Sequence, residues 1–214
     1  MILDWQKTKE LVEKYQIPMV GSLVIETTQE GVEFANRVGF PVVLKLVSND
    51  VLHKIDKGLV KLNIQNEQDL ESAFKALSAL KFQGTQCLEQ IVIQKQVGGT
   101  ELFFGMKRDK SFGPVVSFGL GGIFVEILGD VVFGICPIEK KEAQGMIKSI
   151  KGYKILEGFR GQKGVDIDKL AGILASISKL ALENENIQEI DFNPIIASGK
   201  DIFAVDPKII IGQT

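Results

Sequence analysis

The spacing of apolar residues predicts two helices near the start of the chain. Over residues 4–15 the apolar positions fall on one helical face. A second helix is expected after Thr27, because Thr27 and Glu30 have the spacing of a capping box. Gly39 and Pro41 supply its stop signal.

The next segment contains the first clear strand. VVLKLV at residues 42–47 is β-branched and almost entirely apolar, which predicts a central strand with one charge, Lys45. A polar turn over residues 48–57 follows it. An alternating strand over residues 59–64 and an amphipathic helix over residues 70–80 come next.

Short apolar runs separated by turns that contain Gly or Asp fill the middle of the chain. These runs are IVIQ from Ile91, ELFFGM from Glu101, PVVSF from Pro114, IFVEIL from Ile123 and VVFGI from Val131. Their spacing predicts an antiparallel meander. Helices over residues 142–150 and 168–183, and two final strands, IQEIDF and DIFAV, complete an α+β fold.

The chain carries no repeat, no low-complexity tract and no long linker. We therefore expect two lobes, residues 1–97 and residues 98–214, that meet near Gly98-Gly99 without a flexible tether.

The composition is that of a globular protein with small-molecule or protein partners. Of the 214 residues, 45% are hydrophobic and 24% charged, which excludes a disordered chain. The net charge of −2 and the pI of about 5.6 provide no basic field for a nucleic acid or an anionic membrane.

Targeting and redox features point to a reducing, cytoplasmic location. The N-terminal MILDWQKTKE lacks the apolar core of a signal peptide. Residues 112–138 are apolar, but Glu126, Asp130 and glycines interrupt them, so we expect buried strands rather than a membrane span. Cys87 and Cys136 lie far apart, which suggests neither a zinc site nor a disulfide framework.

Lys45 is the first candidate for chemistry, because a buried ammonium is costly unless an acid or an anionic ligand pairs with it. The alternative is that Lys45 lies at a strand end and extends its ammonium to water. The sequence leaves both open.

The turn SNDVLHKIDKG contains the only histidine of the chain, His53, beside Lys54. An imidazole can carry a phosphoryl group, and a neighbouring lysine with backbone amides can hold that group. The alternative is a solvated loop histidine.

Two motifs near the end of the chain, EIDFNP and AVDPK, place oxygen ligands on strand positions. Asn193 and Asp206 could share a magnesium ion, since Mg²⁺ takes a few oxygen ligands from protein and the rest from water and phosphate. The alternative is that Asn193-Pro194 is a turn and Asp206-Pro207 ends a strand.

The glycines of FGLGGIFVEIL could admit a phosphate to the backbone, but neither a Walker lysine nor a GxGxxG spacing accompanies them. Close packing of backbones explains Gly119, Gly121 and Gly122 equally well.

Five segments of the chain belong together: VVLKLVSNDVLHK, ELFFGMKRDKSFGPVVSFGLGGIFVEIL, MIKSIKGYKILEGFRG, EIDFNP and AVDPKIII. In combination they resemble the ATP-grasp (β) subunit of ADP-forming acetyl-CoA synthetases. The pattern RDxxFGPxxxFGxGGxxxE and the LHK turn are marks of this family and its succinyl-CoA synthetase relatives. The resemblance implies an ATP-grasp fold, two α+β lobes that clasp ATP or ADP.

The resemblance also implies roles for the candidate residues. Lys45 and Lys54 would contact the nucleotide phosphates, residues from Gln94 to Val97 would lie at the adenine hinge, and Glu101 would contact the nucleotide.

By the same resemblance, Asn193 and Asp206 would bind Mg²⁺, and His53 would pass phosphate from a partner subunit to ADP. The overall reaction would convert acyl-CoA, ADP and phosphate reversibly to acid, CoA and ATP. No CoA-binding segment is present in this sequence, so a separate CoA-binding α subunit is expected in a hetero-oligomer.

One position departs from the family pattern. The family turn is close to HKSDVGGV, and Leu59 replaces one of its glycines. If that position needed a positive φ, leucine would cost about 1 kcal/mol or more. This departure motivates an alternative, a non-catalytic partner subunit that keeps the fold. An ATP-grasp ligase acting on amines is a third possibility and would not need His53.

Overall fold

The computed structural model describes residues 1–48, 58–81, 89–122, 125, 127, 129–158 and 164–212. The chain divides into two compact units. The N-terminal unit consists of Asp4–Gln6 and Val20–Val97, and the C-terminal unit of Met1–Leu3, Lys7–Met19 and Gly98–Thr214. Packing thus groups most of the first nineteen residues with the C-terminal unit, whereas the sequence prediction assigns residues 1–97 to one lobe. The functional role of the two lobes stays a prediction.

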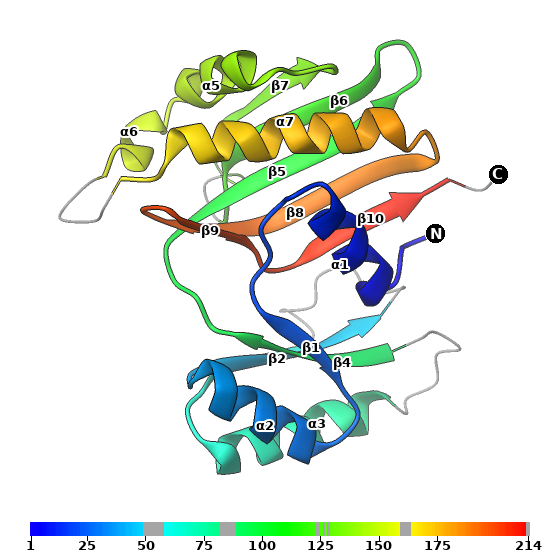
Figure 1. Cartoon of the computed structure of the whole chain (residues 1–214), viewed down its shortest axis with the longest axis vertical. Helices are drawn as coiled ribbons and strands as arrows, with labels where there is room; N and C mark the ends of the chain where they lie inside the picture. The colour runs from blue at the N-terminus through cyan, green and yellow to red at the C-terminus, as the bar shows by residue number, and fades with distance from the viewer. Residues whose placement is uncertain are drawn as a thin grey trace. The chain divides into compact units, whose positions relative to one another are not determined.

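The N-terminal unit is a four-stranded antiparallel sheet with two helices on one face (Figure 1). Its elements are β1 (Ser22–Ile25), α2 (Thr28–Val38), β2 (Val42–Ser48), β3 (Val60–Ile64), α3 (Glu67–Lys81) and β4 (Glu89–Lys95), and the strand order is β1-β4-β2-β3. Alternate residues of β2 and β4 point into a core with α2 and α3, as the period of a strand requires. This core includes Val42, Leu44, Leu46, Ile91 and Ile93.

Helix α2 begins with the predicted capping box. The Thr27 hydroxyl accepts from the Glu30 backbone N–H at 3.3 Å, and the Glu30 carboxylate accepts from the Thr27 N–H at 3.0 Å. Two backbone donors that would otherwise have no helical partner are satisfied reciprocally.

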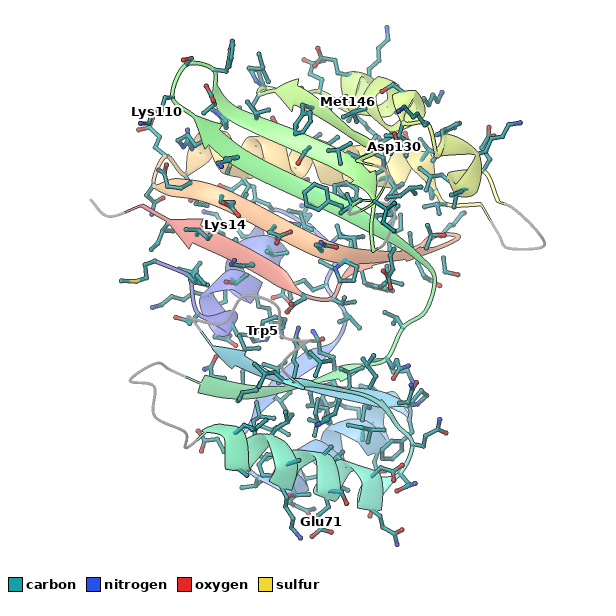
Figure 2. The ribbon with its side chains drawn as sticks, turned by 180° about the vertical axis from the view of Figure 1, so that it is seen from behind. Trp5, Lys14, Glu71, Lys110, Asp130 and Met146 are labelled. Atoms are coloured by element: carbon teal, nitrogen blue, oxygen red, sulfur yellow. The ribbon has the colours of Figure 1, made fainter. Side chains whose placement is uncertain are left out.

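The C-terminal unit is built on a six-stranded antiparallel sheet of order β10-β8-β5-β6-β7, with β9 paired to β8. Its strands are β5 (Thr100–Asp109), β6 (Gly113–Leu120), β7 (Val131–Ile135), β8 (Ile187–Ser198), β9 (Asp201–Ala204) and β10 (Pro207–Ile211). Its helices are α5 (Lys140–Ser149), α6 (Tyr153–Leu156) and α7 (Ile167–Glu183), and α1 (Trp5–Lys14) joins it from Lys7 onward. Figure 2 turns the other face of this sheet toward the viewer, with α7 behind the strands.

The C-terminal end of α7 is capped by a side chain from β5. Arg108 Nη2 donates to Ala181 O at 2.7 Å and to Asn184 O at 3.2 Å, and Arg108 Nε donates to Ile187 O at 3.0 Å. A guanidinium is favourable beside the negative end of a helix dipole. Arg108 therefore fixes the end of α7 to the sheet.

The two ends of the described chain meet at β10. The Met1 ammonium donates to Ile211 O at 2.8 Å, and Ile211 N–H donates to Met1 O at 2.8 Å. Ile2 forms a bridge with Ile210, and Leu3 N–H donates to Ile209 O at 2.9 Å. The first residues thus extend the edge of the C-terminal sheet.

The predicted α+β class is confirmed, and so is the meander for β5, β6 and β7. Two details of the prediction are wrong. IVIQ lies in β4, which belongs to the other sheet. In the predicted strand at residues 123–128, the described residues Val125 and Ile127 are helical, and Val125 N–H donates to Gly122 O at 3.2 Å.

No helix in the described residues is both long enough and apolar enough to cross a membrane. Residues 113–120 and 131–135 within the apolar stretch form the predicted strands.

Candidate functional site

The N-terminal sheet has a second face that carries buried polar side chains. Directly opposed residues of an antiparallel pair point to the same side of a sheet. Gln94 lies opposite both Ser22 and Val43, and Lys45 lies opposite Val92. Since Val42 and Leu44 point toward α2 and α3, these residues lie on the opposite face of the sheet.

Lys45 is buried on this face, with 3% of its surface exposed. The alternative, in which Lys45 extends to water at a strand end, is excluded because Lys45 lies in the middle of β2 and its neighbours cover it. Its Nζ lies 3.9 Å from the centroid of the Trp5 ring, within the range of a cation–π interaction. The two residues belong to the same compact unit.

Gln94 supplies an unmatched donor on the same face. It is 4% exposed, and its Nε2 has no hydrogen-bond partner among the residues that the structure describes. A buried amide donor without an acceptor costs about 1–3 kcal/mol, so native proteins rarely keep one without a reason. A ligand with an acceptor atom would satisfy it. Val97, the last residue of this unit, is half-buried.

Glu101 is the second residue of β5 in the C-terminal unit, and two glycines pack against it. Gly121 N–H donates to Glu101 O at 2.7 Å. A Cβ atom at Gly122, whose φ is +58°, would lie 2.6 Å from the Glu101 Oε2. A Cβ atom at Gly119 would lie 2.6 Å from the Asp130 carbonyl oxygen. Close approach therefore explains why these positions are glycines, and Gly122 leaves space for the exposed Glu101 carboxylate.

Asn193 and Asp206 lie opposite each other in the C-terminal sheet. Phe192 pairs with Pro207, and Ile195 pairs with Ala204, so the same register places Asn193 across from Asp206. Asn193 is exposed and Asp206 half-buried.

A β-bulge accompanies this pair. Between the pairs of β8 with Leu102 and with Phe104, two residues of β8 face one residue of β5. Bulges re-aim side chains and are frequent beside active sites. Two oxygen-bearing side chains on adjacent strands fit a hard cation that takes few protein ligands. The described residues hold no cluster of three or more His, Cys, Asp or Glu side chains suited to a metal.

The histidine turn lies mostly outside the described residues, including His53 and Lys54. Its last residues are described. Gly58 has a φ of +69°, and among the described residues other than glycine only Gln16 and Asn63 have a positive φ. Leu59 is buried in the core with α2 and α3, and its carbonyl accepts from Leu46 N–H at 2.8 Å. The glycine-to-leucine departure thus imposes no left-handed backbone, which removes the reason given for a non-catalytic subunit.

Comparison with known proteins shows the family. A model of the ATP-grasp domain matches residues 1–211. The β subunit of ADP-forming acetate–CoA ligase I from Pyrococcus furiosus is 43% identical over 208 residues, 96% of this chain and 90% of the relative. This chain belongs to the ATP-grasp family of ADP-forming acetate–CoA ligase β subunits. The resemblance inferred from the sequence motifs is confirmed.

Other members of the family are longer. ADP-forming acetate–CoA ligase I from Archaeoglobus fulgidus is 42% identical over 206 residues, which cover 95% of this chain but only 30% of the relative. In that ligase the ATP-grasp region is thus one part of a longer polypeptide.

Solved structures of a third relative show the same fold. A dinucleotide-forming acetyl-coenzyme A synthetase 1 from Ca. Korarchaeum cryptofilum, in complex with coenzyme A, Ca-AMPCP and HgCl+, matches with a TM-score of 0.90 and 40% identity, covering 97% of this chain and 92% of that one. A further structure of it holds coenzyme A and Mg-AMPPCP, with a phosphohistidine segment pointing towards the nucleotide binding site. Its TM-score is 0.84, with 39% identity over 99% of this chain and 93% of that one. The predicted ATP-grasp fold is confirmed.

Sequence reasoning missed two residues of the buried polar face in this ATP-grasp chain. Trp5 fits the apolar stripe of α1, and nothing in the pattern pairs it with a lysine forty residues later. Ser22 lies in β1, a strand of four residues that periodicity does not reveal. In the GSLVIE segment, only the β-branched residues indicate a strand.

Proposed function

We propose that this chain is the nucleotide-binding subunit of an ADP-forming acyl-CoA synthetase. In the overall reaction, acyl-CoA, ADP and phosphate are converted reversibly to acid, CoA and ATP. The observation that carries the proposal is the face of the N-terminal sheet on which Lys45 and the unmatched Gln94 donor are buried side by side, in a chain of this family.

The residues of this face have complementary tasks. The Lys45 ammonium would bind the nucleotide phosphates, because a buried cation is stabilised by an anion that replaces its lost hydration. The Gln94 Nε2 would donate to an acceptor of the bound nucleotide. Val97 and Glu101, on either side of Gly98-Gly99, would complete the nucleotide contacts.

Mg²⁺ would bind to the side-chain oxygens of Asn193 and Asp206. These two groups fit the cation, because they are oxygen donors that lie across from each other and Asn193 remains exposed. The cation would neutralise negative charge on the phosphates.

His53 would carry the phosphoryl group, as the family resemblance implies. In the transfer, the P–N bond to the imidazole breaks and a P–O bond forms to the terminal phosphate of ADP, which yields ATP and a free imidazole. Lys54 would hold the phosphoryl oxygens beside His53. A covalent carrier divides one long transfer into two short ones.

A CoA-binding α subunit would be the partner. The Pyrococcus furiosus relative is a β subunit of similar length, and the Archaeoglobus fulgidus relative carries the same region within a longer chain. We place the complex in the cytoplasm, where a free thiol such as the buried Cys136 persists.

The decisive experiment combines the chain with its α subunit, acyl-CoA, ADP, phosphate and Mg²⁺, and measures ATP formation over a panel of small acyl-CoAs. We expect ATP only when both subunits are present. A chain that binds Mg-ADP but yields no ATP with any acyl-CoA would overturn the catalytic proposal and leave an assembly role.

A further inference from the structure

The contact between Trp5 and Lys45 joins two residues that are far apart in the sequence. Trp5 is the first residue of α1, and Lys45 lies in the middle of β2. Each is 3% exposed, and the Lys45 Nζ lies 3.9 Å from the centroid of the ring. Figure 2 labels Trp5.

Trp5 is buried outside the two hydrophobic clusters that the described residues form. Among the described residues, two hydrophobic clusters form the cores of the two units, and Trp5 belongs to neither. The residues that share the face of Lys45 include the polar Ser22 and Gln94. The buried Val43 and Val92 lie on this face as well, so the indole lies where polar and apolar side chains meet.

An aromatic ring stabilises the ammonium without neutralising its charge, which a carboxylate cannot do. The ring attracts a cation through its quadrupole but carries no net charge. A carboxylate at the same position would neutralise the lysine and repel a phosphate. The indole compensates part of the lost hydration without adding a negative charge beside the Lys45 ammonium.

We propose that Trp5 is a positioning residue for Lys45, which holds the ammonium where the nucleotide phosphates bind. This inference rests on the proposed function, since it takes Lys45 as the phosphate-binding lysine. It assigns to the N-terminal residues of α1 a part in nucleotide binding.

Trp5 is the only tryptophan of the chain, so its ring can be altered without touching any other residue. Growth with mono-, di- or trifluorotryptophan replaces ring hydrogens by fluorine, which weakens the attraction for a cation and changes the volume little. The binding of Mg-ADP and of adenosine to each labelled full-length chain is then measured by calorimetry.

We expect the Kd for Mg-ADP to rise stepwise with the number of fluorines, by about fivefold over the series. The Kd for adenosine, which has no phosphate, should stay constant. In a Lys45→Met chain the stepwise effect should disappear, because no cation remains above the ring. A Kd for Mg-ADP that does not change with fluorination would overturn the positioning role while leaving the proposed function intact.

A spectroscopic measurement gives an independent check. Addition of Mg-ADP to the unmodified chain should change the Trp5 fluorescence, and adenosine should change it less. Trp5→Phe should keep most of the Mg-ADP affinity of the unmodified chain, because phenylalanine retains an aromatic face. Trp5→Leu should lose that affinity. Equal affinities for Trp5→Phe and Trp5→Leu would contradict the proposal, and failure of the unmodified chain to bind Mg-ADP would contradict the proposed function itself.

Discussion

Asn193 of β8 and Asp206, which lies between β9 and β10, are placed across from each other by the register of the flanking pairs Phe192–Pro207 and Ile195–Ala204. If this pair holds Mg²⁺, Asn193→Ala and Asp206→Asn should each raise the Mg²⁺ concentration needed for nucleotide binding by about tenfold, because each removes or weakens one of few protein ligands. Titration of Mg²⁺ at constant ADP measures the effect. Asp201→Asn, an exposed acid at the start of β9, is the matched control and should change nothing.

Removal of the Lys45 charge should weaken Mg-ADP binding strongly. We expect Lys45→Met to raise the Kd for Mg-ADP at least about tenfold, since a charge-assisted hydrogen bond contributes about 1.5–3 kcal/mol. Adenosine binding should change little. The exposed Lys75 of α3 provides a control, and Lys75→Met should behave like the unaltered chain. Equal losses for ADP and adenosine would show that Lys45 serves the fold rather than the phosphates.

The His53 assignment is tested by separating binding from chemistry. His53→Asn should abolish phosphoryl transfer to ADP and leave the Kd for Mg-ADP close to normal, because Lys45 and the magnesium ligands remain. Incubation of the unaltered chain with its phosphorylated α subunit should label it with an acid-labile phosphate that the variant lacks. Full turnover by His53→Asn in the reconstituted complex would refute the relay.

Arg108 should contribute to stability rather than to activity. Arg108→Ala leaves the carbonyl groups at the end of α7 without their donor, and we expect a loss of about 2 kcal/mol in the free energy of unfolding. Urea unfolding measures it. Lys107→Ala, at an exposed position of the same strand, should be within about 0.5 kcal/mol of the parent.

Ionisation of Tyr15 should make the free energy of unfolding depend on pH in the alkaline range. Burial, together with the hydrogen bond to Glu183 at 2.8 Å, raises the pKa of Tyr15 above its ordinary value of 10.0. The folded state therefore keeps this proton longer than the unfolded state, so its contribution is complete below 10.0 and is lost as pH rises through the folded pKa. Between about pH 9 and 11, Tyr15→Phe should lose less stability than the parent chain. If the free energies of unfolding of the two chains changed with pH in parallel, the pKa of Tyr15 would be the same in the folded and unfolded states.

Much of the fold could be predicted because local signals agree with the tertiary structure. The capping box at Thr27 and Glu30 and the amphipathic pattern of α7 are local, and both are confirmed. The segment at residues 123–128 has the β-branched, apolar composition of a strand, yet Val125 and Ile127 are helical. Composition cannot distinguish a short buried strand from a short helical segment.

The candidate site could be predicted only in part. Lys45 stood out because a charge in an apolar strand requires compensation, and the structure shows that the residue is buried. Its aromatic partner, Trp5, could not be predicted, because cross-strand and helix-to-strand contacts depend on register and docking that no local pattern encodes. The meaning of Leu59 likewise depended on a backbone angle, which the structure shows to be ordinary at this position.

The hydrogen bonds that Met1 and Ile211 exchange hold the two ends of the described chain together at one edge of the C-terminal sheet. A connection of a few residues could close the chain into a ring without stretching either strand, and new ends opened in the exposed β5–β6 turn at Lys110 and Ser111 would then leave the sheet order unchanged. A module with adjacent ends can also be spliced into a longer polypeptide while its own architecture stays the same. Adjacent ends are compatible with both arrangements among the relatives, a β subunit of similar length and a longer polypeptide of which the match covers 30%.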